Sequence, residues 1–297
     1  MPRIPATPLI VGCGYVGTRL ARSLIGSGRR PVGLVRTQPA ADALGRQGIA
    51  PVASNLDRTV EEPPAAAENG LVFYLVPPAP ETDDDDPRLR TFLAACGDER
   101  PDRIVYVSTS GVYGDCAGAW VDETRAPAPA SARARRRLAA ERILADWSRQ
   151  TGGDHVILRV GGIYGPDRLP TDRLADMKVV RPEEAPWSNR IHVDDLVTVL
   201  RAAAERGRPG RVYNVADGHP TTMTDYLYRV ADRAGRPRPP AVPLAEAEQH
   251  LSTGMLSFIR ESRRLDITRM QRELGVRLRY PDIDAGLADS LPARRHA

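Results

Sequence analysis

The sequence predicts an α/β protein built on a doubly wound parallel sheet, with a smaller C-terminal lobe. Apolar runs bounded by turn residues alternate with helical patterns, and the first run leads into a glycine-rich turn. Such alternation joins parallel strands through right-handed crossovers and covers the sheet on both faces. With 297 residues the chain is long enough to bury a sizeable core.

The expected elements follow one another along the chain. Buried strands are expected in five apolar runs: 8–14, 30–36, 70–78, 102–110 and 155–162. Helices are expected between and after them, at 17–28, 39–47, 87–96, 133–150 and 193–206. Later, a proline-rich connection leads to a helix near 245–260, and a helix-like pattern covers 267–275 and is followed by the stretch 280–291. The acidic run 83–86 is interpreted as a hydrated loop.

This order of elements suggests two interleaved parts. Residues 1–165 form the expected core, whose sheet is completed by 190–216, and residues 166–297 supply mainly a substrate-binding lobe.

Composition narrows the setting. The net charge is +4, too small to indicate a nucleic-acid partner, and Lys178 is the only lysine, so arginine is favoured throughout the chain. Cys13, Cys96 and Cys116 show no metal-ligand spacing, and we expect unpaired thiols and no metal site. No run is long enough to span a membrane and no signal-peptide pattern opens the chain, so we expect a cytoplasmic protein without membrane contact.

The stretch "LIVGCGYVGTRLA" carries the first chemical motif. Gly12, Gly14 and Gly17 form a GxGxxG between a strand and a helix, with Cys13, Tyr15 and Val16 between them. Such glycines allow a tight turn, close approach of a pyrophosphate, and packing of helix on strand, while the helix N-terminus supplies free N–H groups. The motif predicts a Rossmann-type dinucleotide site.

Arg36 and Thr37 end the second strand, where the cofactor is selected. An acidic residue there holds the ribose 2′-hydroxyl, whereas an arginine accommodates a 2′-phosphate. Residues 31–41 contain no Asp or Glu, and this absence does not depend on the arginine bias. The sequence therefore predicts NADP in preference to NAD. The alternative is that Arg36 is a solvated surface charge.

Later motifs carry a family resemblance. By itself "GCGYVG" also resembles the opening of the UDP-glucose dehydrogenase group, but "YVSTSGVYGD", "LRVGGIYGP", "NRIHVDDL" and "RVYNVADG" follow in order. Together they resemble the extended short-chain dehydrogenase/reductases, the NAD-dependent epimerase/dehydratase family, over almost the whole chain. GxGxxG in place of GxxGxxG, and "LVPP" where Ala-Ala is common, resemble its atypical branch.

The resemblance assigns catalytic positions. It implies that Thr109 orients the substrate oxygen. Counting back from Glu141 places Arg137 at the family's lysine and Arg133 at its tyrosine, so the YxxxK pair is absent. Arg137 keeps the positive charge, but a guanidinium such as Arg133 cannot exchange protons. Tyr113 is a further candidate near Thr109, with a packing role as its alternative.

The same resemblance implies further cofactor contacts at the carboxyl ends of the strands. These contacts are Asn55, Leu56, Val76, Pro77, Ser108, Val160 and Gly161. His192 occupies a signature position before a helix whose first turn holds Asp194 and Asp195, where carboxylates offset unpaired N–H groups.

The arginines of "SARARRRLAAERIL" have two expected roles. Arg133 and Arg137 lie four apart and share a helix face, so both are expected to project into the cofactor crevice. Arg137 would hold the ribose or a phosphate, and Arg133 would meet an anionic substrate group. Arg135 and Arg136 are expected on other faces. The alternative is that all four are solvated.

Two function classes remain open. The first is an NADP-dependent oxidoreductase or epimerase-like enzyme acting on a small polar substrate, nucleotide-sugar-like or phosphorylated. The second is a catalytically silent NADP(H)-binding sensor or regulatory protein. A homodimer is also expected through the apolar side chains Leu138, Ile143, Leu144 and Trp147, unless these face their own sheet.

Overall fold

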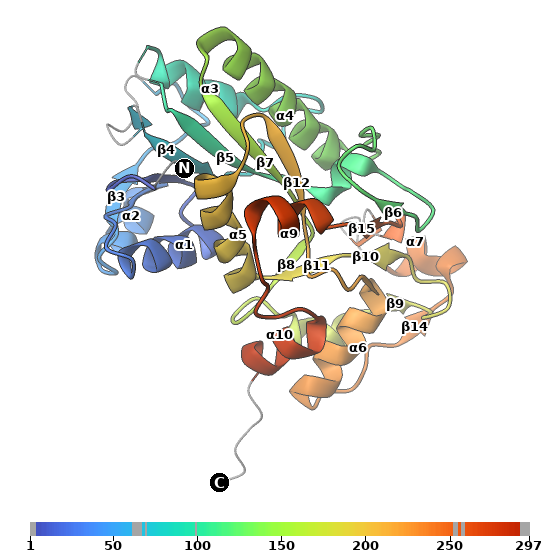
Figure 1. The fold of residues 1–297 in the computed structure, drawn as a ribbon. Coiled ribbons are helices and arrows are strands. Elements are labelled where there is room, and N and C mark those ends of the chain that lie inside the picture. Colours follow the sequence, from blue (N-terminus) through green and yellow to red (C-terminus); the bar gives the residue numbers. More distant parts are fainter. Residues whose placement is uncertain are drawn as a thin grey trace.

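A seven-stranded parallel sheet forms the centre of the computed structural model, which describes residues 4–60, 67–68, 70–98, 100–251, 255–256 and 259–291 (Figure 1). The strand order is β12-β7-β5-β4-β1-β2-β3. The strands are β1 (Leu9–Val11), β2 (Val32–Val35), β3 (Ala50–Ala53), β4 (Leu71–Tyr74), β5 (Arg103–Thr109), β7 (Asp154–Val160) and β12 (Arg211–Val215). The order reverses between β1 and β4, where such sheets bind ligands. The predicted doubly wound parallel sheet is confirmed.

Side-chain alternation along the strands explains the helical layers on both faces. Ile10 and Phe73 belong to one apolar cluster, whereas their neighbours Leu9 and Val72 belong to the other. The first cluster takes in apolar side chains of α1 (Tyr15–Ile25), α2 (Gln38–Gly45) and α5 (Val193–Arg206). The second takes in those of α3 (Pro87–Cys96) and most of those of α4 (Ala132–Thr151). The five helices were predicted within two residues of these bounds, except for the end of α1.

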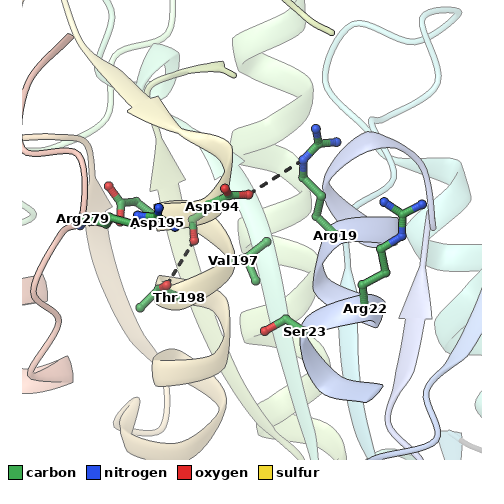
Figure 2. A pocket seen from close by; sticks show the side chains of 8 residues that line it. All are labelled: Arg19, Arg22, Ser23, Asp194, Asp195, Val197, Thr198 and Arg279. Atoms are coloured by element: carbon green, nitrogen blue, oxygen red, sulfur yellow. Dashed lines mark hydrogen bonds and ion pairs between the residues drawn. The ribbon is translucent and has the colours of Figure 1, made fainter. Parts of the chain in front are cut away.

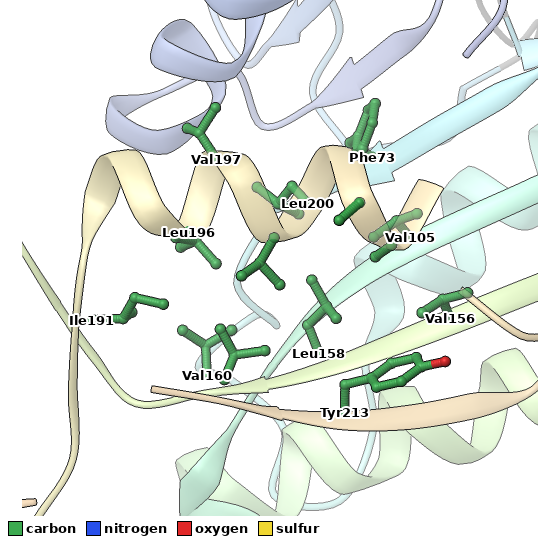
Figure 3. Packing of buried hydrophobic residues seen from close by; sticks show 14 of the residues in the cluster. Phe73, Val105, Val156, Leu158, Val160, Ile191, Leu196, Val197, Leu200 and Tyr213 are labelled. Atoms are coloured by element: carbon green, nitrogen blue, oxygen red, sulfur yellow. The ribbon is translucent and has the colours of Figure 1, made fainter. Parts of the chain in front are cut away.

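Helix α5 shows how the core fixes the strand ends. Leu196 and Leu200 point from α5 onto the sheet, where Val105 of β5 and Leu158 of β7 meet them (Figure 3). All four side chains are fully buried, and burying each one contributes about 1.5–3 kcal/mol. This packing therefore holds the carboxyl ends of β5 and β7, which carry Thr109 and Val160, in fixed positions.

The C-terminal lobe is built on short strands and two helices. Its strands pair as β8 (Gly162–Tyr164) with β11 (Arg190–His192), β9 (Val179–Val180) with β14 (Ala241–Val242), and β10 (Trp187–Ser188) with β13 (Thr221–Thr222). A further pair, β6 (Trp120–Val121) with β15 (Arg264–Leu265), links the two parts. Helices α6 (Met223–Ala234) and α10 (Ile283–Ser290) share an apolar cluster with Tyr164.

The chain passes between the lobe and the core more than once. Strand β12 pairs with β7 after the first lobe segments, and α9 (Thr268–Leu274) buries Met270 and Leu274 in the sheet's own cluster. Further helical segments are α7 (Ala247–His250) and the short 3-10 turns Ser110–Tyr113, Thr171–Asp176 and Leu244–Glu246.

Three expectations about local structure need correction. Asp86 is fully buried instead of lying in a hydrated loop, because its carboxylate caps α3 by accepting the Leu89 N–H at 3.1 Å. The helix expected near 245–260 is interrupted: α7 ends at His250, Leu251 is extended, and residues 255, 256 and 259 are helical again, while residues 252–254 and 257–258 lie outside the described residues. Strand β3 was not among the predicted strands: most of its residues are exposed, and it contains Pro51.

The surface expected to form a homodimer is not available. Leu138, Ile143, Leu144 and Trp147 of α4 are each at most 9% exposed and pack in the chain's own clusters. The prediction that these side chains form a dimer interface is therefore wrong, and their alternative role is the correct one.

Two further observations concern the chain's setting. Within the described ranges, no helix is long and apolar enough to cross a bilayer. Cys13, Cys96 and Cys116 are free, as predicted, and all three are buried.

Candidate functional site: a dinucleotide cleft and an adjoining arginine-lined cavity

A cavity of about 650 Å³ lies at the carboxyl ends of the central strands, where the strand order reverses. Its lining includes most of the residues predicted to bind the cofactor: Gly12, Cys13, Gly14, Tyr15, Val16, Arg36, Thr37, Asn55, Leu56, Val76 and Pro77. The structure thus brings together segments that are up to 65 residues apart in the sequence, as expected for a doubly wound sheet.

The three motif glycines each meet a different steric requirement. Gly12 has φ +89°, and a Cβ there would stand 2.8 Å from Val76 Cγ2. A Cβ on Gly17 would stand 2.9 Å from the Gly12 carbonyl oxygen, so this glycine lets α1 pack against the turn. A Cβ on Gly14 would meet nothing within 4 Å. Gly14 therefore faces open space where a pyrophosphate can approach the N-terminus of α1, and the residues present fit a dinucleotide.

Arg36 is exposed at the cleft, at the end of β2. A pair that the sequence did not reveal lies on the same lining: Asp57 and Arg88 form an ion pair of 2.5 Å, and Arg88 also donates to the Pro77 carbonyl at 3.0 Å. The hydrogen bonds from Arg88 lower the pKa of the Asp57 carboxyl. Asp57 is thus an acid in the cleft that already has a cationic partner. Its position two residues after Asn55 was the signal that could have found it.

A second cavity of about 410 Å³ adjoins the dinucleotide cleft. The two share the lining residues Pro77, Val107, Arg137, Ile163 and Arg168. Thr109 lines the second cavity, and its Oγ1 accepts the Gly111 N–H at 3.2 Å. Because the oxygen is the acceptor in this bond, the hydroxyl proton is left for another partner.

Four of the predicted cofactor contacts do not line the dinucleotide cleft, and their contact with the cofactor stays a prediction. Ser108, Val160 and Gly161 line the second cavity instead of the dinucleotide cleft, and Gly17 is buried beneath the turn. The Ser108 hydroxyl donates to Glu141 Oε1 at 2.6 Å, so its side chain is committed to the protein interior. Gly17 thus packs against the glycine turn, and Ser108, Val160 and Gly161 form part of the wall of the second cavity.

Glu141 of α4 forms a buried ion pair with Arg159 of β7. Arg159 donates to its two carboxylate oxygens at 3.2 and 2.7 Å, and both side chains are about 6% exposed. From the sequence alone, Glu141 was only the reference position from which Arg137 and Arg133 were located. The structure shows that it fixes α4 against β5 and β7, next to Thr109.

Tyr113 does not reach the site. Its hydroxyl donates to Asn214 Oδ1 at 2.7 Å in the core, its ring is 1% exposed, and the Arg159 guanidinium lies 4.8 Å from the ring centre. Burial raises the pKa of its phenol. The candidate catalytic role of Tyr113 is therefore wrong, and its packing alternative describes it correctly.

Arg137 lies where both cavities meet. Its Nη1 donates to the carbonyl oxygens of Val76 at 3.2 Å and Val107 at 2.9 Å, and contacts the Tyr106 hydroxyl at 3.1 Å. These bonds join α4 to the ends of β4 and β5. A contact from Arg137 to the cofactor ribose stays a prediction.

The other arginines of α4 divide differently from the expectation. Arg133 lines the second cavity and not the dinucleotide cleft, and its expected contact with an anionic substrate group stays a prediction. Arg136 lines it too, which corrects its expected placement, and its side chain donates to the carbonyl oxygens of Pro80 and Thr82. Arg135 instead pairs with Asp84 at 3.1 Å. The alternative in which all four are merely solvated is wrong.

A third cavity, of about 470 Å³, lies between α1 and α5 (Figure 2). Arg19 faces Asp194 across it at 3.8 Å, and Thr198 donates to the Asp194 carbonyl at 3.1 Å. Asp195 accepts the N–H groups of residues 279 and 280. The charged groups of the third cavity thus have partners within the chain, and none of the predicted catalytic or cofactor-binding residues lines this cavity.

His192 caps the N-terminus of α5 and has a structural role. Its Nδ1 accepts the Asp194 N–H at 3.3 Å, and its Nε2 lies 3.2 Å from the Ser290 hydroxyl. Ligand-type atoms of His192, Asp194 and Asp289 lie within 4.8 Å of one another. Since both ring nitrogens already have partners, we assign no metal to this group.

Comparisons with known proteins agree with this geometry. Residues 89–216 match the model of the NAD dependent epimerase/dehydratase family. A solved structure of a functionally unknown conserved protein from Silicibacter pomeroyi is 33% identical, with TM-score 0.81, covering 99% of this chain and 100% of that one. Protein YeeZ of Escherichia coli is 26% identical over 92% of this chain and 96% of its own length.

A third relative has a described reaction. A 4-hydroxy-2-methyl-3-oxo-4-farnesyl-3,4-dihydroquinoline-1-oxide ketoreductase from Stigmatella aurantiaca is 29% identical over 75% of this chain and 72% of its own length. The glycine turn at the switch point of the sheet and the motifs after it agree with these matches. The chain belongs to the NAD dependent epimerase/dehydratase family.

Proposed function

We propose that the protein is an NADP(H)-dependent oxidoreductase acting on a carbonyl or alcohol group of a small polar substrate. The observation that carries the proposal is that the two cavities adjoin. The cleft at the glycine turn shares Val107 and Arg137 with a second cavity, which is lined by Thr109. A bound nicotinamide cofactor supplies hydride transfer.

The chain's own groups would hold the cofactor from one end to the other. The N–H groups at the start of α1 face the open space beside Gly14 and would bind the pyrophosphate. Arg36 would contact the 2′-phosphate, since residues 31–41 offer no carboxylate. Arg137 would face the nicotinamide ribose while its Nη1 anchors α4 to β4 and β5.

Thr109 and Arg133 would act on the substrate oxygen. The Thr109 hydroxyl can donate a hydrogen bond to that oxygen and keep its proton, because its own oxygen accepts the Gly111 N–H. Arg133 would stabilise the negative charge that develops there. Among the described residues that line the second cavity there is no Tyr, His, Lys or Cys. We therefore assign the final proton to water.

The Stigmatella relative supports the carbonyl chemistry, since its name describes a ketoreductase. Among the described residues, the lining of the second cavity contains no Tyr, His, Lys or Cys that could donate the proton. This favours a second candidate, a silent NADP(H)-binding sensor. The two differ in turnover. An oxidoreductase consumes NADPH with some member of a panel of ketones and aldehydes, and Thr109→Ala slows that consumption. A sensor binds NADPH and shows no consumption with any of them.

The cofactor assignment is tested by calorimetric titration of NADPH and NADH. A charged contact to the 2′-phosphate strengthens binding about ten- to a hundredfold, and the exposure of Arg36 places the expected preference for NADPH near tenfold. Arg36→Gln should remove this preference. Arg46→Gln, an exposed arginine after α2 that does not line the cleft, is the matched control and should keep it. Equal affinities for both cofactors in the wild type contradict the assignment.

A further inference from the structure

The second cavity is strongly cationic. Among the described residues its lining contains a single carboxylate, Glu261, which pairs with Arg263 at 2.8 Å. Its lining arginines are Arg133, Arg136, Arg137, Arg168, Arg190 and Arg263. An excess of positive charge around a concave site raises the local concentration of anions.

Arg190 is a buried arginine of this lining that has no ion pair with a carboxylate among the described residues. Its residue is 6% exposed, and its buried Nε has no hydrogen-bond partner. Its Nη2 lies 3.1 Å from Met223 Sδ, a weak acceptor, and the guanidinium stands 4.2 Å from the centre of the Tyr226 ring. Within the described residues, no carboxylate oxygen forms an ion pair with it at 4.0 Å or less. A buried charge without such a partner is costly, and an anion bound beside Arg190 would offset that cost.

Asp217 is the acidic residue whose charge acts most on Arg190, and it is a poor counter-ion. Its backbone N–H donates to the Arg190 carbonyl at 2.7 Å, but its buried Oδ2 has no partner. Burial raises the pKa of the Asp217 carboxyl to about 7, so near neutral pH a large part of it is protonated. The cation is left facing the cavity.

The backbone makes room for this guanidinium. Gly162 in β8 is the register partner of Arg190 in β11, and both line the cavity. A Cβ on Gly162 would stand 2.4 Å from Arg190 Nη1. A side chain at this position would therefore push the guanidinium out of place without changing the charge of the cavity.

We propose that Arg190 binds a compact oxyanion, a phosphate or carboxylate group, in the second cavity. The group belongs to the substrate, and this identification rests on the proposed function. Two parallel N–H donors of a guanidinium match the paired oxygens of either group. Arg133 and Arg168, on the same lining, add positive charge around the bound anion.

The test is calorimetric titration of the full-length protein at pH 7 with inorganic phosphate and, separately, with malonate. Arg190→Gln should weaken binding of the preferred anion about ten- to a hundredfold. Gly162→Ala, which keeps every charge, should weaken it in the same direction. Tighter binding of phosphate assigns a phosphate group, and tighter binding of malonate assigns a carboxylate. Failure of both anions to bind overturns the proposal.

Arg36→Gln is the control for anions that bind in the dinucleotide cleft, because it removes an arginine there and leaves the second cavity intact. Anion binding that is lost in Arg36→Gln and kept in Arg190→Gln and Gly162→Ala places the ion in the cofactor cleft and overturns the proposal. Thermal unfolding of each variant shows whether it is folded, and Gly162→Ala serves if Arg190→Gln is not.

NADPH titration of the same samples separates the two proposals. Normal NADPH binding without anion binding refutes the Arg190 site alone. Anion binding that depends on Arg190, in a protein that binds neither NADPH nor NADH, supports the anion site and refutes the oxidoreductase.

Discussion

Glu141→Gln should destabilise the protein substantially, although Glu141 lines neither of the two adjoining cavities. The carboxylate receives three hydrogen bonds, from the Ser108 hydroxyl at 2.6 Å and from Arg159 at 2.7 and 3.2 Å. Removing one partner of a buried ion pair costs about 3–5 kcal/mol, because the other charge stays buried and uncompensated. The amide oxygen of glutamine still accepts one bond, so we expect a loss near 3 kcal/mol.

The assay is urea unfolding followed by circular dichroism, with the free energy extrapolated to water. Asp232→Asn is the matched control. It breaks an ion pair with Arg238 whose side chains are 50% and 57% exposed, and it should cost less than about 1 kcal/mol. The double variant Glu141→Leu with Arg159→Met removes both charges together and should recover most of the loss.

The reasoning is refuted if Glu141→Gln costs no more than Asp232→Asn. It is also refuted if the double variant is less stable than Glu141→Gln, because packing or helix propensity would then explain the effect better than an unpaired charge. A loss near 3 kcal/mol with recovery in the double variant shows that the charge of Arg159 sets the cost.

Two further predictions concern Asp217 and the arginines of α4. The pKa of Asp217 is raised by burial to about 7 in the fold, against about 3.9 in an unfolded chain, so the folded state binds the proton more tightly and stability falls as pH rises from about 4 to about 7. Asp217→Asn mimics the protonated form, so at pH 8 it should be more stable than the wild type by up to a few kcal/mol and unfold at a higher temperature. At pH 4 the two proteins should unfold at nearly the same temperature. An equal difference in unfolding temperature at both pH values contradicts this prediction. Arg137→Ala should weaken NADPH binding about tenfold in calorimetry, whereas Arg133→Ala should leave it unchanged and slow turnover; unchanged NADPH binding in Arg137→Ala would remove that arginine from the cofactor site.

The parts of the fold that could be predicted depend on local patterns. The apolar runs and the glycine turn gave the buried strands of the sheet, and five helices have bounds close to those expected. The cofactor cleft was also predictable, because a doubly wound sheet places the carboxyl ends of its strands together.

The remaining features depend on contacts between distant residues. Glu141 meets Ser108 and Arg159, which are 33 and 18 residues away, and no pattern within the helix reveals either partner. Asp86 could be assigned to a hydrated loop because its neighbours are acidic, and only the packing of α3 shows it to be a buried cap. The isolation of Arg190 is likewise invisible in a chain where arginine is the common cation.

The late position of β12 in the chain has a consequence for biosynthesis. Strand β7 ends at Val160 and its outer neighbour β12 ends at Val215, so 55 residues must be translated before that side of β7 can be paired. At about 5–20 residues per second this takes roughly 3–11 seconds. During that time the growing chain carries an unpaired, apolar strand at the edge of its sheet, which is a template for wrong pairing with other chains. The yield of folded protein in a cell should therefore depend on how quickly this stretch is translated or on what covers the edge meanwhile.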